Sequence, residues 1–271
     1  MISLEDDFND VISKAQKGLK LSDAGLAGLA GVAEADVVQV RKGHFDETLV
    51  RKLAVPLHLG PDALVAIGGK AWLPPKIVKP AGLSAFVSSY GDMVVNSYSV
   101  WDAESGRCVF FDTGADSTEM LNDAAQRRSG VQAILITHTH PDHVADLART
   151  ITSCGARAWV CELEPMVAAS SFVAGHVFTL GGIRIETRQT SGHSRGGMTY
   201  VIHGLSEPVA IVGDSIFAGS MGGANDAYQE ALRNNREKIL TLPGNTILCP
   251  GHGPLTTVGE ERLHNPFFAG E

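Results

Sequence analysis

Apolar residues near the start of the chain recur with the period of an α-helix and never with that of a strand. Cap residues and turn glycines predict further helices over residues 23–30 and 34–42. Two more helices are predicted to begin at Asp46 and at Pro61. One face of the first predicted helix carries residues spaced i, i+3, i+4 and i+7, namely Phe8, Val11, Ile12 and Ala15. Residues 1–73 are therefore expected to form an all-helical domain.

The pattern changes to short apolar or alternating runs after a proline-rich segment, residues 74–80, which predicts a linker because proline blocks helices. Helices are predicted again over residues 118–128, 144–151 and 224–241. Strands are predicted over residues 83–88, 94–101, 107–111, 131–136, 156–161, 183–187, 198–202, 209–212 and 246–248. This alternation indicates an α/β domain with mixed sheets over residues 81–271.

Composition and charge narrow the classes of function. The net charge of −8 argues against a general nucleic-acid or anionic-membrane surface. No apolar run approaches the roughly 18 residues that a membrane span needs, and the acidic N-terminus lacks the features of a signal peptide. The four cysteines are scattered without a CxxC pair, which is typical of a cytoplasmic protein with reduced thiols. Cys249 is interpreted as a buried strand residue.

Four potential metal ligands leave the end of one predicted strand within six residues. The stretch from Thr137 to His143 reads THTHPDH and contains His138, His140, Asp142 and His143 directly after the apolar run of residues 131–136. Ligands are commonly placed on loops at the carboxyl ends of strands in α/β proteins. The motif therefore predicts a metal site on the loop side of the sheet.

Three later residues have the same placement. His193 follows an alternating run, and Asp214 and His252 follow the apolar runs of residues 209–212 and 246–248. Together with the motif they provide five histidines and two aspartates at strand ends, which suit two divalent ions. Imidazole favours zinc or iron and carboxylates favour harder metals, so zinc is expected, with iron or manganese as alternatives.

With these residues the chain resembles the metallo-β-lactamase superfamily, and within it the glyoxalase II-like hydrolases. The resemblance extends over about residues 80–268 and includes FDTG at residues 111–114, GDSIFAGS at 213–220 and PGHGP at 250–254. It implies a four-layer αββα sandwich. It also implies that one metal is held by His138, His140 and His193, the second by Asp142, His143 and His252, and that Asp214 bridges the two.

The resemblance implies a hydrolase in which two metals acidify a shared water, with Asp142 and Asp214 as the catalytic carboxylates. Beyond the metal cluster no general acid is evident, so a small thioester, activated ester or lactone is favoured over an amide. Residues 220–225 contain neither the cations nor the tyrosine with which glyoxalase II enzymes hold glutathione. Arg195 is a candidate grip for a substrate carboxylate. Asp112 is interpreted either as orienting a ligand or as part of a solvated turn.

Two alternatives remain open from the sequence. A persulfide-dioxygenase-like enzyme would bind one iron through His138, His193 and Asp214. A metabolite-sensing regulator would use residues 21–43, which resemble a helix-turn-helix. The predicted recognition helix begins with Glu34 and Asp36, so we expect no DNA binding; a homodimer contact or a cover for the catalytic domain is the other interpretation of these helices.

Overall fold

Five short helices form the N-terminal part of the computed structural model, which describes residues 3–270. Asp7 caps the first of them through a capping box with Asp10, and the predicted face of Phe8, Val11, Ile12 and Ala15 is buried. Residues 3–73 contain no strand, as predicted. The helices are α1 (Phe8–Gly18), α2 (Asp23–Ala30), α3 (Glu34–Arg41), α4 (Glu47–Ala54) and α5 (Pro61–Gly68).

Helix α2 has the bounds expected from the sequence, with Ser22 as its N-cap and Gly31 in the left-handed conformation at its end, and α3 ends at Arg41, one residue earlier than expected. Arg41 is paired with Asp23 at 2.7 Å, so its charge is used within the helical region. DNA binding by the α2–turn–α3 unit and the domain bounds 1–73, 74–80 and 81–271 stay predictions.

Two six-stranded sheets follow. The first has the order β1-β2-β3-β4-β5-β6, antiparallel from β1 to β3 and parallel from β3 to β6. Its strands are β1 (Leu83–Tyr90), β2 (Met93–Asp102), β3 (Arg107–Phe111), β4 (Gly130–Leu135), β5 (Arg157–Cys161) and β6 (Ala169–Phe172).

The second sheet has the order β12-β11-β10-β9-β8-β7. Strands β8, β10 and β11 run in one direction, because β9 is antiparallel to both β8 and β10 and β11 is parallel to β10. Their carboxyl ends therefore lie at the same edge. The strands are β7 (Val177–Leu180), β8 (Ile183–Gln189), β9 (Met198–His203), β10 (Val209–Gly213), β11 (Ile247–Pro250) and β12 (Thr256–Thr257).

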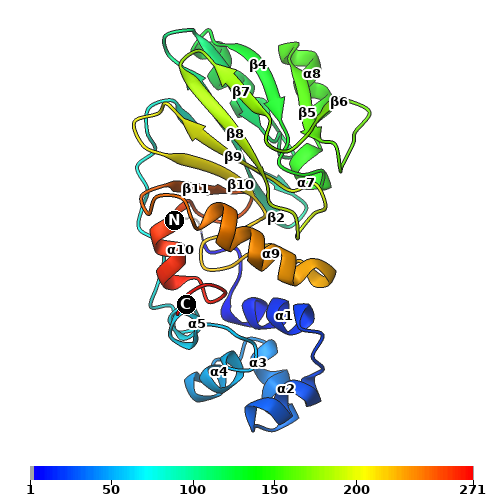
Figure 1. Ribbon diagram of the computed structural model, residues 1–271, viewed down its shortest axis with the longest axis vertical. Coiled ribbons are helices and arrows are strands. Elements are labelled where there is room, and N and C mark those ends of the chain that lie inside the picture. Colours follow the sequence, from blue (N-terminus) through cyan, green and yellow to red (C-terminus); the bar gives the residue numbers. More distant parts are fainter. Residues whose placement is uncertain (1–2, 271) are drawn as a thin grey trace.

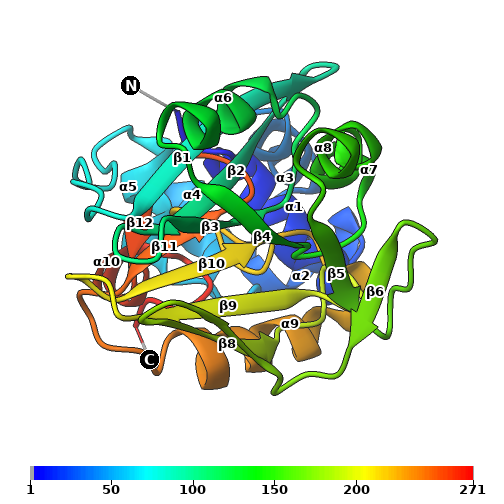
Figure 2. The same ribbon diagram turned by 90° about the horizontal axis from the view of Figure 1, so that it is seen from above.

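Helices cover the outer faces of both sheets, which gives the expected four-layer αββα sandwich (Figure 2). Helices α6 (Thr118–Gln126) and α8 (Leu147–Cys154) cover the first sheet, and α9 (Tyr228–Asn234) and α10 (Val258–His264) cover the second. Phe111, Leu135, Tyr200 and Ile211 belong to the core between the sheets. Cys249 is fully buried in β11, as interpreted from the sequence.

The helical region packs directly against the sandwich (Figure 1). Ile12 of α1 and Leu64 of α5 belong to the same hydrophobic core as Tyr228 of α9 and Val258 of α10. Burial of these side chains stabilises the contact between the two parts of the chain. Within residues 3–270, no helix combines the length and hydropathy needed to cross a membrane.

The structure differs from the predicted secondary structure at three short strands and at two helices. Strands β6, β7 and β12 were not predicted, because β6 and β7 have only four residues each and β12 has two, too few for an alternating pattern to show. The helix expected over residues 144–151 is two helices, α7 (Pro141–Val144) and α8, separated at Ala145 and Asp146.

The single helix expected over residues 224–241 is also interrupted. It consists of a 3₁₀ turn, η1 (Asn225–Ala227), then α9, then a π-helical turn, η2 (Asn235–Ile239). Asn234 donates to the carbonyl of Ser191 and Asn235 to that of Ser215, both at 2.7 Å. Two consecutive side chains thus contact the loops of His193 and Asp214, and a π-turn with its extra residue is one way a helix accommodates such contacts.

Candidate metal centre

The THTHPDH motif spans the loop after β4 and the first three residues of α7, and most of its polar side chains are buried. His143 is 0%, His138 2% and Asp142 6% exposed. Pro141 occupies the first turn of α7, where a missing N–H costs little. Because β4 is rigidly held in the sheet, the loop that follows it presents these side chains in a fixed arrangement.

The structure brings all seven predicted ligands together. Their ligand atoms form three sets, each within 4.8 Å: His138, His140 and His193; Asp142, His143 and His252; and His138, His143 and Asp214. His193, Asp214 and His252 follow β8, β10 and β11, whose carboxyl ends share one edge of the second sheet. Their roles as ligands stay a prediction from the sequence, with which this arrangement agrees.

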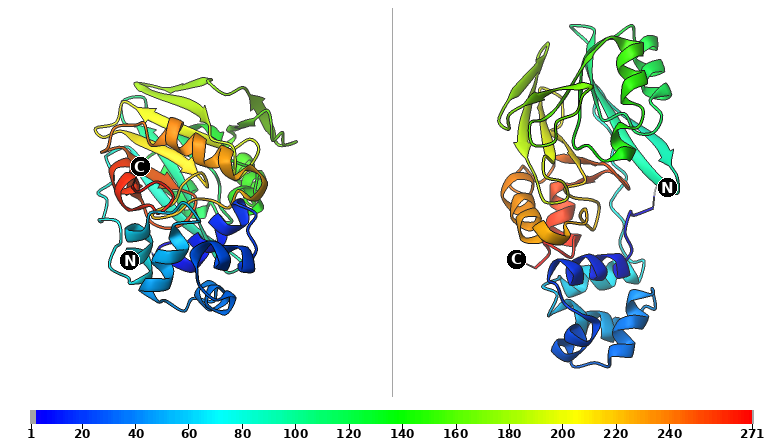
Figure 3. Two further views of the ribbon diagram at one scale, coloured as in Figure 1. Left: turned by 60° about the horizontal axis from the view of Figure 1, so that its bottom comes forward. Right: turned by 90° about the vertical axis from the view of Figure 1, so that its right-hand side faces the viewer.

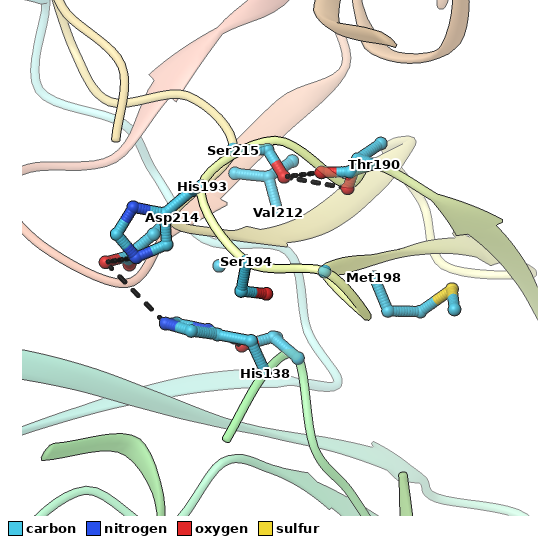
Figure 4. A pocket seen from close by; sticks show the side chains of 11 residues that line it. His138, Thr190, His193, Ser194, Met198, Val212, Asp214 and Ser215 are labelled. Carbon is cyan, nitrogen blue, oxygen red and sulfur yellow. Dashed lines mark hydrogen bonds and ion pairs between the residues drawn. The ribbon is translucent and has the colours of Figure 1, made fainter. Parts of the chain in front are cut away.

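Asp214 lies between the two triplets of side chains that the resemblance assigns to separate metals. Its Oδ2 is 3.3 Å from Nε2 of His193 and 3.5 Å from Nε2 of His252, while its Oδ1 is 3.4 Å from Nε2 of His143. Figure 4 shows His138 and His193 turned toward this carboxylate. One carboxylate thus faces histidines of both triplets.

Outer hydrogen bonds fix the orientation of three imidazole rings. Nδ1 of His143 donates to Asp112 at 2.8 Å, Nδ1 of His193 to the carbonyl of Gly223 at 2.9 Å, and Nδ1 of His252 to that of Val94 at 2.7 Å. Since Nδ1 carries the hydrogen in each case, Nε2 keeps a lone pair directed into the centre. This is the arrangement that metal-binding histidines need.

Thr137 places His138 in the same way. Its hydroxyl donates to Asp112 at 2.7 Å and lies 3.0 Å from Nδ1 of His138, from which it can accept. Asp112 also accepts from the Thr137 N–H at 2.7 Å and is only 3% exposed, so the solvated-turn interpretation of Asp112 is wrong.

The buried atoms of the centre fit a pair of cations. Within residues 3–270, Nε2 of His143 and Oδ1 of Asp214 are both buried without a hydrogen-bond partner. Nδ1 of His140 lies 3.1 Å from Nε2 of His138 and 3.0 Å from Nε2 of His193. Buried polar atoms without partners are costly, and converging lone pairs repel one another unless a cation lies among them.

The electrostatics of the centre also favour added positive charge. Burial alone would lower the pKa of His143, but the carboxylates of Asp214 and Asp112 outweigh it and raise that pKa to about 10. Burial likewise opposes the charged form of His252, and Asp142 and Asp214 raise its pKa to about 11. Burial would raise the pKa of Asp214, but His143, His252 and His138 hold it well below its usual range.

Two glycines leave room that a side chain would fill. A Cβ atom on Gly251 would lie 2.1 Å from Oδ1 of Asp214, and one on Gly222 would lie 2.8 Å from Nδ1 of His193. A hollow lined by His138, His193, Asp214 and Ser215 leaves about 10 Å³ for the centre of a water molecule, which is room for roughly one water or ion (Figure 4).

Arg195 is exposed on the loop after His193 and, among residues 3–270, no partner of its guanidinium is found. Glu164 has a clearer structural role that the sequence analysis missed. Its carboxylate accepts from the N–H groups of Thr139 at 3.0 Å and Gly196 at 2.9 Å, and so ties the motif loop to the His193 loop. Nothing in its sequence context, a turn after β5, signals this contact.

Comparison with known proteins agrees with this geometry. The model of the metallo-beta-lactamase superfamily matches residues 90–252. The chain belongs to the metallo-beta-lactamase superfamily. Within the superfamily it is 26% identical to a probable metallo-hydrolase of Streptococcus pyogenes, over 59% of this chain and 80% of the relative.

Two further members are similar over comparable lengths. Hydroxyacylglutathione hydrolase GloC of Haemophilus influenzae is 25% identical, over 64% of this chain and 92% of its own. The crystal structure of BLEG-1 B3 metallo-beta-lactamase superposes with a TM-score of 0.61 at 26% identity, covering 69% of this chain and 100% of that one. The matched region begins after the N-terminal helices, so the superfamily model does not describe residues 1–89.

Proposed function

We propose that this chain is a dinuclear metal-dependent hydrolase of small thioesters or activated esters, with zinc as its metal. The observation that supports it most is Asp214, a buried carboxylate facing histidines from two complete triplets. His138, His140 and His193 would hold one ion, and Asp142, His143 and His252 the other. When bound, two such metal ions would supply a nucleophilic hydroxide at neutral pH and a Lewis acid for the carbonyl oxygen of the substrate.

The chain's own residues keep the centre organised for this reaction. Asp112, Gly223 and Val94 hold three imidazole rings through their outer nitrogens, and Asp214 balances positive charge on both sides. Since these groups are fixed before substrate arrives, little reorganisation is needed during the reaction. Asp142 and Asp214 are the carboxylates proposed to take part in catalysis.

The hollow beside the centre favours a good leaving group. Of the described residues that line it, only His138, His193 and Asp214 titrate, and all three are proposed ligands. No separate acid lies there to protonate an amine as it leaves. A thiol, with an ordinary pKa near ~8.5, leaves as thiolate without one, so thioesters should react faster than amides.

A thioester substrate is supported by the similarity to GloC, whose name, hydroxyacylglutathione hydrolase, describes an enzyme that cleaves an acyl group from glutathione. Glutathione itself is a weak candidate here, because residues 220–225 contain no cation and no tyrosine. The exposed guanidinium of Arg195 is proposed to bind a substrate carboxylate through paired hydrogen bonds.

A panel of thioester, lactone, amide and phosphodiester substrates, run on zinc-loaded protein with metal analysis, tests the proposal. We expect turnover of small thioesters and at least ~100-fold slower turnover of the matching amides. Consumption of oxygen with a persulfide by a protein holding one iron would instead establish the dioxygenase alternative.

A further inference from the structure

The segment before α1 reaches the metal centre from outside the region that the superfamily model matches. It runs from α1 along the side of the sandwich toward the end of the β1–β2 hairpin, as the right-hand view of Figure 3 shows. Ser220 donates a hydrogen bond from its hydroxyl to Asp6 at 2.6 Å. Lys14, on α1, pairs with the same carboxylate and donates to the carbonyl of Met221 at 2.9 Å.

The Asp6–Lys14 pair is largely removed from water. The two side chains are 10% and 22% exposed, whereas the neighbouring Asp7–Lys70 pair is 38% and 72% exposed. An exposed pair contributes little, but removing one partner of a buried pair leaves a charge without compensation. Mutating Lys14 and Lys70 therefore compares the loss of a buried ion pair with the loss of an exposed one, at adjacent aspartates of the same short segment.

The Asp6–Lys14 pair contacts Ser220 and Met221, and Gly223, two residues after Met221, contacts a proposed metal ligand. On the other side of the loop of residues 220–223, the side chain of Asn265 donates to the carbonyl of Ser220 at 2.8 Å. Directly after Met221, the N–H of Gly222 donates to the carbonyl of Asp214 at 3.1 Å, and the carbonyl of Gly223 accepts from Nδ1 of His193 at 2.9 Å. Movement of Met221 would therefore move the acceptor that orients the His193 ring.

The same segment touches the loop of the second triplet. Gly253 follows His252 and has φ of +72°, and a Cβ atom there would lie 3.1 Å from the backbone nitrogen of Glu5. One short stretch of chain thus packs against the loop after Asp214, whose Gly223 orients His193, and against the loop that carries His252, but only its contact to residues 220–221 uses a buried ion pair.

We propose that Asp6 and Lys14 are positioning residues of the metal centre, which act through the loop of residues 220–223 to hold His193 toward its metal. The proposal deepens the proposed two-metal function and rests on it. The N-terminal helical region would then contribute to metal binding by positioning a ligand, although neither Asp6 nor Lys14 touches substrate or metal.

The test compares the zinc affinity of full-length Lys14→Met and Asp6→Asn with that of the matched control Lys70→Met. Protein loaded with zinc is dialysed against graded chelator, and cobalt substitution reports the surroundings of each ion by its visible spectrum. We expect both variants to lose one ion at 10- to 100-fold lower chelator concentration, with the second ion retained as in the unmodified protein. Lys70→Met should match the unmodified protein, and Lys14→Arg should restore retention.

Unfolding of the metal-free variants separates positioning from general stability. If Lys14→Met does not fold, Ser220→Ala takes its place, and we expect the same selective loss of one ion with a smaller shift. The proposal would be overturned if Asp6→Asn and Lys14→Met, or Ser220→Ala, bound both zinc ions as tightly as the unmodified protein does. Parallel loss of both ions that follows the decrease in unfolding midpoint would also overturn it. These readouts do not depend on hydrolysis, so failure to cleave thioesters would count against the proposed function alone.

Discussion

Oδ2 of Asp112 lies 2.8 Å from Nδ1 of His143, while Nε2 of the same ring faces Asp142 and Asp214 at 3.5 and 3.4 Å. Asp112 has a φ of +54°, a conformation that is uncommon outside glycine and is tolerated best by Asp and Asn. The backbone is thus held in an unusual conformation at the residue whose carboxylate orients a proposed ligand.

Asp112→Asn should weaken metal binding without preventing folding. The carboxylate accepts from His143 and from two donors of Thr137, and an amide can satisfy only part of this set. We expect metal affinity to fall 10- to 100-fold, measured by chelator competition. Asp116→Asn, at a carboxylate whose side chain is 64% exposed, is the control. Affinity equal to the control would show that Asp112 does not orient the ring.

Gly251→Ala should disrupt the centre by crowding alone. The added Cβ would lie 2.1 Å from Oδ1 of Asp214 and 2.6 Å from Cε1 of His143, closer than real contacts allow. Gly182→Ala is the control, because Gly182 is exposed outside the centre and a Cβ there has no neighbour within 4 Å among the described residues. Elemental analysis should find metal lost from the first variant and kept in the second. Full metal content in Gly251→Ala would mean that the loop yields easily.

The seven proposed ligands could be predicted from the sequence because each follows a strand end, and strand ends are local patterns. His193, Asp214 and His252 then meet at one edge of the second sheet, because β8, β10 and β11 run in the same direction. Contacts between distant segments had no such signal. Glu164 joins two loops through backbone N–H groups, and Asp6 meets Ser220 across 214 residues of sequence.

The short strands β6 and β7 and the interrupted helix around α9 were missed for a related reason. Periodicity needs several residues to show, and four-residue strands provide too few. The π-turn at Asn235 places a polar side chain toward Ser215, so tertiary contacts modify the helical pattern.

Glu261→Gln should remove a pH dependence of stability. Burial, opposed by hydrogen bonds from Thr256 and Asn265, raises the pKa of Glu261 to about 7 from 4.5. The folded state therefore holds this proton more tightly than the unfolded state. Its contribution is fully present below about pH 4.5 and is lost as pH rises through about 7, with a maximum of roughly 3 kcal/mol.

Urea unfolding of metal-free protein at pH 5.5 and pH 8 measures this effect. The unmodified protein should lose more unfolding free energy between the two pH values than Glu261→Gln. Glu237→Gln, at an exposed position, removes the same charge and should behave as the unmodified protein. Identical pH dependence in all three would exclude Glu261 as the source.

Arg195→Ala should affect acidic substrates selectively. If the exposed guanidinium binds a substrate carboxylate, its loss should raise KM for acidic thioesters by a factor corresponding to roughly 1.5–3 kcal/mol. KM for neutral thioesters should stay nearly constant. Steady-state kinetics on a matched pair of acyl thioesters provides the measurement, and equal effects on both would assign Arg195 no part in recognition.

The metal content of the unmodified protein and of Asp214→Ala tests the two-metal account most directly. Asp214 faces His138, His143, His193 and His252 from one buried position, so its loss should affect both ions. We predict about two zinc ions per chain for the unmodified protein, and loss of both ions and of hydrolysis in Asp214→Ala under the same dialysis. One iron per chain in the unmodified protein, or two ions retained by Asp214→Ala, would contradict the account.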